Sequence, residues 1–319
     1  MMANKLYASV TNTSDIYQIR FSEAHNDSAP MCIIDARTSS LDVGDSITVN
    51  IGYIGNHSQI FTGYVKSVTK NTPPTIKKIS AYGEMIRAVD FFIAASNPEN
   101  PFTRSNISAE DLVEDVIALA GLTNYGYDAT SFTFGVKNNV EVNLTGAYDF
   151  CKMIADLLAW HLYADQNGKV WFVDRKPYVM GGDSPTATIG ESDIITADYL
   201  ESERNLRNRV VVYGAEGIYA TASASSPYLP AGFYKSVVAS AWWIDTQSMA
   251  QLAANYNLAL LNRLTKEGTI VMMGDASLQA RDVVTISETN TGMSGNWYVY
   301  GIEHMWSQRG FTTTLTVRQ

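Results

Sequence analysis

Apolar and polar residues alternate along much of this chain, and the alternation follows the same order in two places. Residues 41–49 run Leu-Asp-Val-Gly-Asp-Ser-Ile-Thr-Val, and residues 278–286 run Leu-Gln-Ala-Arg-Asp-Val-Val-Thr-Ile. A period of two residues is that of a strand with one buried face. The shared leucine, aspartate and β-branched positions therefore predict two copies of one strand pattern.

The strands that follow each copy match as well. Residues 61–68 correspond to residues 298–304, and a third strand closes each unit at residues 76–82 and 311–317. The chain is therefore predicted to contain two similar small β-units. Three copies of such a chain would supply six equivalent units, which suits an adaptor between a sixfold and a threefold object.

Residues 1–96 are predicted to form the first β-barrel. Alternation over residues 46–51 and 60–65 is typical of half-buried strands. Turn-forming residues at 12–15 and 71–74 separate these strands from their neighbours. A small antiparallel barrel or sandwich is the expected product.

The middle region, residues 97–185, is predicted to be a compact α+β domain. A break that contains two prolines precedes a helix over residues 108–120. A second helix is expected over residues 146–161, and a hairpin with an Asn-Gly turn at 167–168 follows it. The middle region is thus expected to combine helices with strands.

Residues 186–319 are predicted to form the second β-barrel domain. It is interrupted by an exposed excursion at about 215–245, rich in Ala, Ser and Tyr, and by a helix over 247–266. The strands from residue 268 on include the second copy of the repeat. The predicted fold class is mainly β with α+β: two similar small antiparallel β-barrels of the tube type and a middle α+β domain.

Length and composition are those of a globular protein with more than one domain. The chain has 319 residues, of which 46% are hydrophobic and 17% are charged. No apolar stretch approaches the roughly 18 residues of a membrane span, and the first residues lack the apolar core of a signal peptide. We therefore expect no membrane span, folding in the cytoplasm, and free, buried thiols at Cys32 and Cys151.

The net charge of −9 argues against a protein that grips nucleic acid. Binding to the phosphate backbone depends on clustered Lys and Arg side chains that release counterions. A neutral or negative surface would instead suit a wall past which DNA slides without sticking.

No group of residues predicts catalysis, a metal site or a cofactor. The four histidines are expected in different elements, with the third closing a helix: His25, His57, His161 and His304. The chain has no Gly-x-Ser-x-Gly elbow, phosphate-binding loop or dinucleotide fingerprint. A pair of carboxylates for glycoside cleavage stays open, because their separation is not encoded by sequence spacing.

The densest basic cluster consists of Arg204, Arg207 and Arg209. The neighbouring carboxylates of Glu201 and Glu203 make a local ion-pair patch the favoured interpretation. An anion site and a subunit contact are the alternatives.

The adjacent residues Trp242 and Trp243 form a second candidate contact. Large aromatic side chains are enriched at binding hot spots. One of the two is expected to belong to the core, and the other could anchor a partner. Together with the three arginines, these tryptophans are the predicted subunit or partner interface.

The succession of patterns in the C-terminal part is recognisable as a whole, although no single motif is diagnostic. Its parts are Arg-Asn-Leu-Arg-Asn-Arg-Val-Val-Val-Tyr-Gly at 204–214, the helix start at 244–250, and the strands at 278–286, 296–307 and 310–317. The succession resembles baseplate hub proteins of contractile-tailed phages, the late control protein D type, which are similar to the N-terminal part of type VI secretion spike proteins. The first barrel and the middle domain match in order only.

The resemblance implies a structural, non-enzymatic homotrimer without cofactors. Its six barrels would form a pseudo-sixfold ring that continues the tail tube, and its middle domains would face the threefold central spike. The implied partners are the tail tube or a tube-initiator protein and the central spike, with the tape measure protein and the baseplate wedge as further candidates. DNA would pass through the lumen without specific binding. The implied location is the virion tail baseplate, assembled in the host cytoplasm.

Two other functions stay open at this point. A tail-tip glycan or peptidoglycan hydrolase would need a cleft with two carboxylates, or a metal with bound water. A carbohydrate-binding attachment module would show an exposed ladder of aromatic side chains, which the 18 tyrosines permit.

Overall fold

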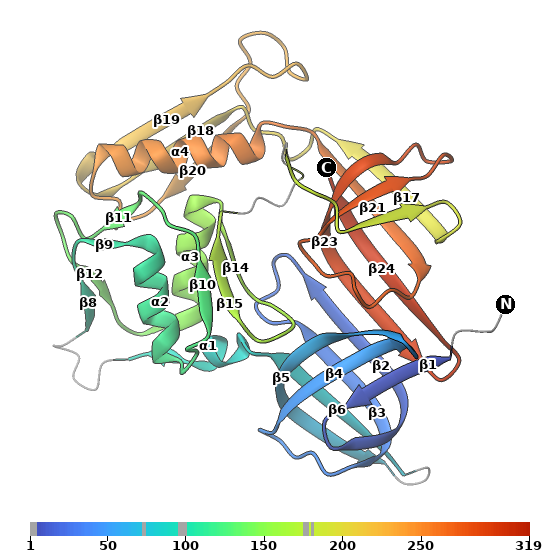
Figure 1. Ribbon diagram of the computed structural model, residues 1–319. Coiled ribbons are helices and arrows are strands. Elements are labelled where there is room, and N and C mark those ends of the chain that lie inside the picture. Colours follow the sequence, from blue (N-terminus) through green and yellow to red (C-terminus); the bar gives the residue numbers. More distant parts are fainter. Residues whose placement is uncertain (1–4, 72–74, 95–100, 175–178, 180–181) are drawn as a thin grey trace.

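Two β-barrels and a helical region make up the computed structural model of the chain (Figure 1). The structure describes residues 5–71, 75–94, 101–174, 179 and 182–319. The barrels lie next to each other, and the helices of the middle region pack beside them (Figure 1). The fold class is as predicted: mainly β, with a middle α+β part.

The first barrel is closed by its own N-terminal strand. Its strands follow the order β1-β4-β5-β6-β3-β2, and β1 pairs with both β4 and β2. A closed ring of strands leaves few unpaired backbone groups. The six strands are β1 (Leu6–Val10), β2 (Thr13–Ala24), β3 (Met31–Ser39), β4 (Ser46–Tyr53), β5 (Asn56–Asn71) and β6 (Ile76–Gly83).

The second barrel repeats this order as β16-β22-β23-β24-β21-β17. The one difference in polarity is that β16 runs parallel to β22, whereas β1 runs antiparallel to β4. The prediction of two similar β-units is confirmed. Its strands are β16 (Ala187–Gly190), β17 (Ile194–Ser202), β21 (Thr265–Met273), β22 (Val283–Ser287), β23 (Ser294–Ser307) and β24 (Gly310–Arg318).

The repeat extends to single hydrogen bonds. In the turn before β4, the amide of Asp42 donates to the Asp45 carboxylate over 2.9 Å. In the turn before β22, the amide of Gln279 donates to the Asp282 carboxylate over 2.8 Å. The aspartate shared by the two sequence copies thus has one structural role, which is to close the turn that starts the strand.

The two barrels share one sheet and one buried core. β2 pairs with β23, so the strands of both barrels belong to a single 12-stranded sheet. Equivalent buried pairs lie opposite each other: Ile34 faces Ile79 in the first barrel, and Ile270 faces Leu315 in the second. The buried apolar residues of both barrels form one cluster.

Between the two barrels, the described residues form three helices and short strands, of which α1 and β7 come before residue 97. Helix α2 starts as predicted, because the Ser108 hydroxyl accepts from the amide of Asp111 over 3.2 Å. The helices are α1 (Ile86–Asp90), α2 (Ala109–Leu119) and α3 (Ala147–Leu158). The strands are β7 (Phe92–Ile93), β8 (Phe102–Arg104), β9 (Ile107–Ser108), β10 (Tyr125–Tyr127), β11 (Thr133–Phe134), β12 (Val140–Val142), β13 (Thr145–Gly146), β14 (His161–Ala164) and β15 (Val170–Val173).

Helix α3 is shorter than the predicted span of 146–161. It ends at Leu158, because Ala159 adopts a left-handed conformation (φ 56°) that terminates the helix. His161 therefore does not close the helix but begins strand β14, where it is buried. The expected hairpin does follow, as β14 pairs with β15 in antiparallel fashion.

A small α/β layer is inserted between β17 and β21. It contains β18 (Arg209–Tyr213), the 3-10 turn η1 (Ala215–Gly217), β19 (Tyr219–Ser223), β20 (Ser236–Ser240) and α4 (Gln247–Leu261). The segment 215–245, expected as an exposed excursion, thus contributes two strands to the sheet β19-β18-β20. Helix α4 ends five residues before the predicted position 266, since β21 already begins at Thr265 to pair with β17.

This inserted layer packs with the middle region. Buried residues of β18, β19 and α4 belong to the same apolar cluster as those of α2 and α3, and Val212 and Ala253 are members with no exposed surface. The predicted domain limit at 185/186 stays a prediction. The limit at 96/97 lies outside the described residues.

Candidate functional site

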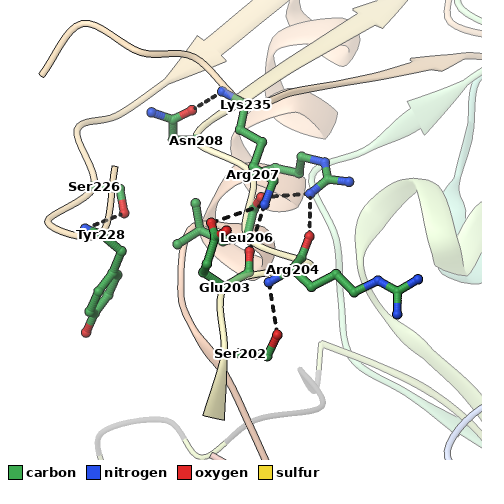
Figure 2. A network of polar contacts seen from close by, with 9 residues as sticks. All are labelled: Ser202, Glu203, Arg204, Leu206, Arg207, Asn208, Ser226, Tyr228 and Lys235. Carbon is green, nitrogen blue, oxygen red and sulfur yellow. Dashed lines mark hydrogen bonds and ion pairs between the residues drawn. The ribbon is translucent and has the colours of Figure 1, made fainter. Parts of the chain in front are cut away.

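The three arginines of the predicted interface follow β17. Arg204 and Arg207 lie in the loop that leaves this strand (Figure 2), and Arg209 comes after the loop. Arg207 donates to the backbone carbonyls of Arg204, over 3.0 Å, and Leu206, over 2.8 Å. Arg209 begins β18 and lies over the ring of Tyr234, 5.4 Å from its centre. Arg207 and Arg209 therefore stabilise the loop and the start of β18 through backbone and aromatic contacts.

The ion-pair patch expected around these arginines does not form among the described residues. The carboxylate of Glu203 pairs instead with Lys235, over 3.2 Å, and Lys235 also donates to the Glu203 carbonyl (Figure 2). Sequence proximity favoured the arginines, but β20 brings Lys235 to this loop through its register with β18. The arginine side chains remain candidates for a subunit contact.

The two tryptophans separate as expected into one core and one surface residue. Trp243 is 8% exposed, whereas Trp242 is 59% exposed. Their rings lie 5.4 Å apart in an edge-on arrangement. Exposed Tyr213, Tyr219 and Val238 lie on the strands of the same inserted layer. Trp242 stays a predicted partner contact.

A second group of residues, which sequence reasoning missed, lies where the two barrels meet. Along this junction β2 pairs antiparallel with β23, from Gln18 opposite Ser307 to Ala24 opposite Gly301. Each of the two strands already pairs with a strand of its own barrel on its other edge. The junction is therefore a main-chain ladder that joins the two units edge to edge.

A buried ion pair crosses the junction. Arg281, in the turn before β22, pairs with Glu23 at the end of β2; the side chains are 5% and 11% exposed. The Arg281 guanidinium also lies over the ring of Tyr163 from the middle region, 3.9 Å from its centre. Burial raises the pKa of the Glu23 carboxyl, and the neighbouring Arg281 opposes this effect. Because charges at this depth are poorly hydrated, each depends on the other.

Two histidines meet beside this ion pair, although they were expected far apart. The rings of His25 and His161 lie 4.1 Å apart, next to Tyr298 and Tyr300 of β23. Burial and the nearby Arg281 lower the pKa of His25 to about 3. The ring of His25 is therefore neutral at physiological pH, which suits a packed junction. No sequence signal could have shown this contact, because it depends on how three parts of the fold meet.

The geometry offers nothing that holds a metal. Within the described residues, no three His, Cys, Asp or Glu side chains come together as ligands. A polar cavity of about 420 Å³ lies beside the junction, lined by Glu23, Asp165 and Arg281 among others. Its carboxylates are engaged: Glu23 pairs with Arg281, and Asp165 accepts from Trp171 and from two backbone amides.

Both cysteines are free and buried, as predicted. Burial raises the pKa of each thiol above its ordinary range. None of the helices in the described part of the chain is both long and apolar enough to cross a membrane.

Buried histidines make the folded protein sensitive to acid. Burial lowers the pKa of His304 from 6.5 to about 4. Between pH 6.5 and pH 4 the imidazole of His304 binds a proton in the unfolded chain but not in the folded chain. The stability that the neutral His304 contributes is therefore fully present above pH 6.5 and is lost as the pH falls toward 4. Between pH 7 and pH 5 we expect His304 to account for a loss of about 2 kcal/mol in the free energy of unfolding.

Urea denaturation at the two pH values measures this loss, and His304→Gln serves as the variant that cannot titrate. We expect the difference between pH 7 and pH 5 to shrink in that variant. An unchanged difference would show that His304 is protonated in the folded state as well.

Solved structures show where this arrangement occurs elsewhere. The chain is similar to the tail protein from Neisseria meningitidis MC58, with a TM-score of 0.71 at 13% identity over 99% of this chain and 97% of that one. It is also similar to the 43 kDa tail protein of prophage MuSo2 from Shewanella oneidensis, with a TM-score of 0.70 at 12% identity over 99% and 98% of the two chains. The chain has the fold of phage tail proteins.

A third similar structure comes from a secretion system. It is the Escherichia coli c3393 protein, a component of the type VI secretion system described as structurally similar to T4 bacteriophage tail proteins gp27 and gp5. The TM-score is 0.60 at 8% identity, over 98% of this chain and 76% of that one. The fold of these neighbours agrees with the predicted resemblance to hub proteins.

The sequence comparisons have a different outcome. No protein-family model and no curated protein matches the chain. The likeness to the solved structures is therefore a likeness of fold at 8–13% sequence identity.

Proposed function

We propose that this protein is the structural baseplate hub of a phage contractile tail. The observation that carries the proposal is the pair of equivalent barrels joined edge to edge within one chain. The full-length likeness to tail proteins supports it. The tail baseplate of the virion is then its place, after assembly in the host cytoplasm.

In this proposal three copies form a ring of six barrels. The contact between β2 and β23 is heterologous, since it joins two different edges of the repeated unit. A heterologous contact that repeats with a closing rotation generates a ring. Three chains with two units each then have sixfold symmetry in their barrels and threefold symmetry in their middle regions.

Such a ring joins the sixfold tail tube, or a tube-initiator protein, to the threefold central spike. The tape measure protein and the baseplate wedge are further proposed partners. The net charge of −9 suits a channel through which DNA passes without specific binding. Arg204, Arg207, Arg209 and Trp242 are proposed to contact a partner or another subunit.

Nothing in the geometry favours the two alternative functions. A glycan hydrolase needs an available acid and a second carboxylate, whereas Glu23 in the polar cavity is held by Arg281. A carbohydrate-binding module needs an extended aromatic ladder. In the inserted layer the exposed Tyr213 and Tyr219 form one cross-strand pair, with ring centres 6.1 Å apart, whereas the exposed Trp242 lies outside these strands.

The trimer is tested by mass and by copy number. One chain has a mass of 35.1 kDa, so three chains have a mass of about 105 kDa. We expect sedimentation to reveal this species as the protein concentration rises. Quantitative mass spectrometry of particles that carry the protein should count three copies per tail. Six or two copies per tail would contradict the proposed ring.

A further inference from the structure

The internal repeat assigns each strand of the junction a counterpart. β2 and β17 occupy the same place in their barrels, and each carries a bulge, at Tyr17 and at Ile195. β5 and β23 correspond in the same way, with bulges at Lys66 and Tyr300. When these bulges are aligned, each residue of β2 corresponds to the residue of β17 that lies 178 positions later in the sequence. Each residue of β23 corresponds to the residue of β5 that lies 234 positions earlier.

The counterparts of the two junction strands, β17 and the last part of β5, each have one edge without a partner strand in the described chain. In the described chain β17 ends the sheet and pairs only with β21. The part of β5 from Lys66 to Asn71 pairs with β6 on one side and has no strand on the other. Both segments are largely exposed, and Ile195 and Leu200 on β17 are apolar residues with 58% exposure each. Open, partly apolar edges of this kind attract another strand.

We propose that β17 of one copy pairs antiparallel with β5 of the next copy, in the register that β2 and β23 adopt within the chain. Transferring that register places Ser202 opposite Ser67, Leu200 opposite Thr69, and Asp198 opposite Asn71. The pairing rests on the proposed function for its occupant, a second copy of this chain, but its register rests on the repeat alone.

Charge along the two edges is complementary. β17 carries Asp198 and Glu201 without a basic residue. The β5 edge carries Lys66, which pairs with Asp90 of its own chain, and Lys70, without an acidic residue. In the transferred register Glu201 faces Val68 and lies diagonal to both lysines. Opposite charges at such positions favour the pairing over a self-association of either edge.

The β2–β23 joint within the chain and the proposed β17–β5 joint between copies differ at the position of Arg281. Inside the chain Glu23 is held by Arg281, which has a φ of 77°. Between copies the counterparts are Glu201 and Gly44, which has a φ of 97° and open space where a side chain would begin. The backbone at position 44 thus has the conformation that Arg281 adopts, but it carries no side chain. The joint between copies lacks the buried ion pair and is the weaker of the two.

Disulfide cross-linking tests the register. Directly opposite residues of an antiparallel pair have Cα atoms about 4.5–5.5 Å apart, which a disulfide can span. We expect Leu200→Cys combined with Thr69→Cys to give covalent dimers and closed trimers under mild oxidation. Leu200→Cys combined with Lys70→Cys is the matched control, since Lys70 points to the other face of the sheet. The native cysteines are buried and stay in both variants.

A gain-of-function variant tests the missing ion pair. We expect Gly44→Arg to tighten association of the copies about tenfold, because it restores the guanidinium that Glu201 lacks. Adding Glu201→Gln should abolish the gain. Gly55→Arg is the control, since Gly55 also has a positive φ (85°) and open space but lies in the turn between β4 and β5.

The outcomes separate this pairing from the proposed function. The register is overturned, and the hub function is left standing, if a trimer forms in which the cysteines introduced at positions 200 and 69 stay reduced. The same conclusion follows if only the control variant with Lys70→Cys cross-links. Cross-links in the expected register within open chains of copies support the pairing and contradict the closed trimer. Absence of any cross-link at all protein concentrations overturns the pairing.

Discussion

Arg281→Met is expected to lower the free energy of unfolding by about 3–5 kcal/mol, because it leaves the buried Glu23 carboxylate without its partner. The loss reflects desolvation: an uncompensated charge at this depth cannot regain its water. Urea denaturation followed by far-UV circular dichroism measures it. The neighbouring ring of Tyr163 also loses its cationic partner.

Two controls show whether the ion pair is the cause. Arg20 and Glu303 pair across the same β2–β23 junction at 3.6 Å, but their side chains are 46% and 44% exposed, so Arg20→Met should cost less than about 1 kcal/mol. Replacing both buried partners, as Glu23→Leu with Arg281→Met, should recover most of the loss. If the double variant is as unstable as Arg281→Met alone, burial of an unpaired charge is not the reason.

Trp297→Ala is expected to cost about 3–5 kcal/mol in the free energy of unfolding. The indole is 2% exposed in the second barrel and meets the ring of Tyr199 edge-on, 5.7 Å away. In the repeat its counterpart is Gly63, whose place in the first core is filled by the buried Phe61. The indole is thus specific to the core of the second barrel, and its removal leaves a cavity there.

Thermal and urea denaturation measure this cost, with Trp242→Ala as the matched tryptophan control. Because Trp242 is exposed, its replacement should change the free energy of unfolding by no more than about 0.5 kcal/mol. Equal effects at both tryptophans would contradict the assigned core. The proposed joint between copies would weaken as well, since Tyr199 belongs to β17.

The repeat was the part of the fold that sequence alone could predict. Leu41 and Leu278 are both buried, and Asp45 and Asp282 close equivalent turns, so local hydrogen bonds and burial preserve the same residue types. Alternation also located the strands, because one face of each lies in the shared core. Gly44 and Arg281 differ in sequence but share a left-handed backbone, which no pattern of polarity reveals.

Contacts between distant parts were beyond sequence reasoning. Glu23 and Arg281 lie 258 positions apart and meet only because β2 pairs with β23. The helix expected over 146–161 was too long, since the left-handed Ala159 carries no glycine signal. Residues 215–245 were expected as an exposed excursion because they are rich in Ala, Ser and Tyr, yet Ala220 and Ala222 of β19 are buried.

Sequence reasoning predicted the burial of the two tryptophans better than the contacts of the arginines. The separation of Trp242 from Trp243 was expected and is confirmed, whereas the ion pair expected for the arginines forms between Glu203 and Lys235. Lys235 lies 32 positions from Glu203 in the sequence. Only the pairing of β18 with β20 brings it close.

Electron cryo-microscopy of tails that contain this protein tests the central claim most directly. We predict a ring of six barrels built from three chains, in which first and second barrels alternate and every second joint is a β17–β5 pairing between chains. Six chains in the ring, or chains whose two barrels do not occupy equivalent places around the axis, would contradict the account.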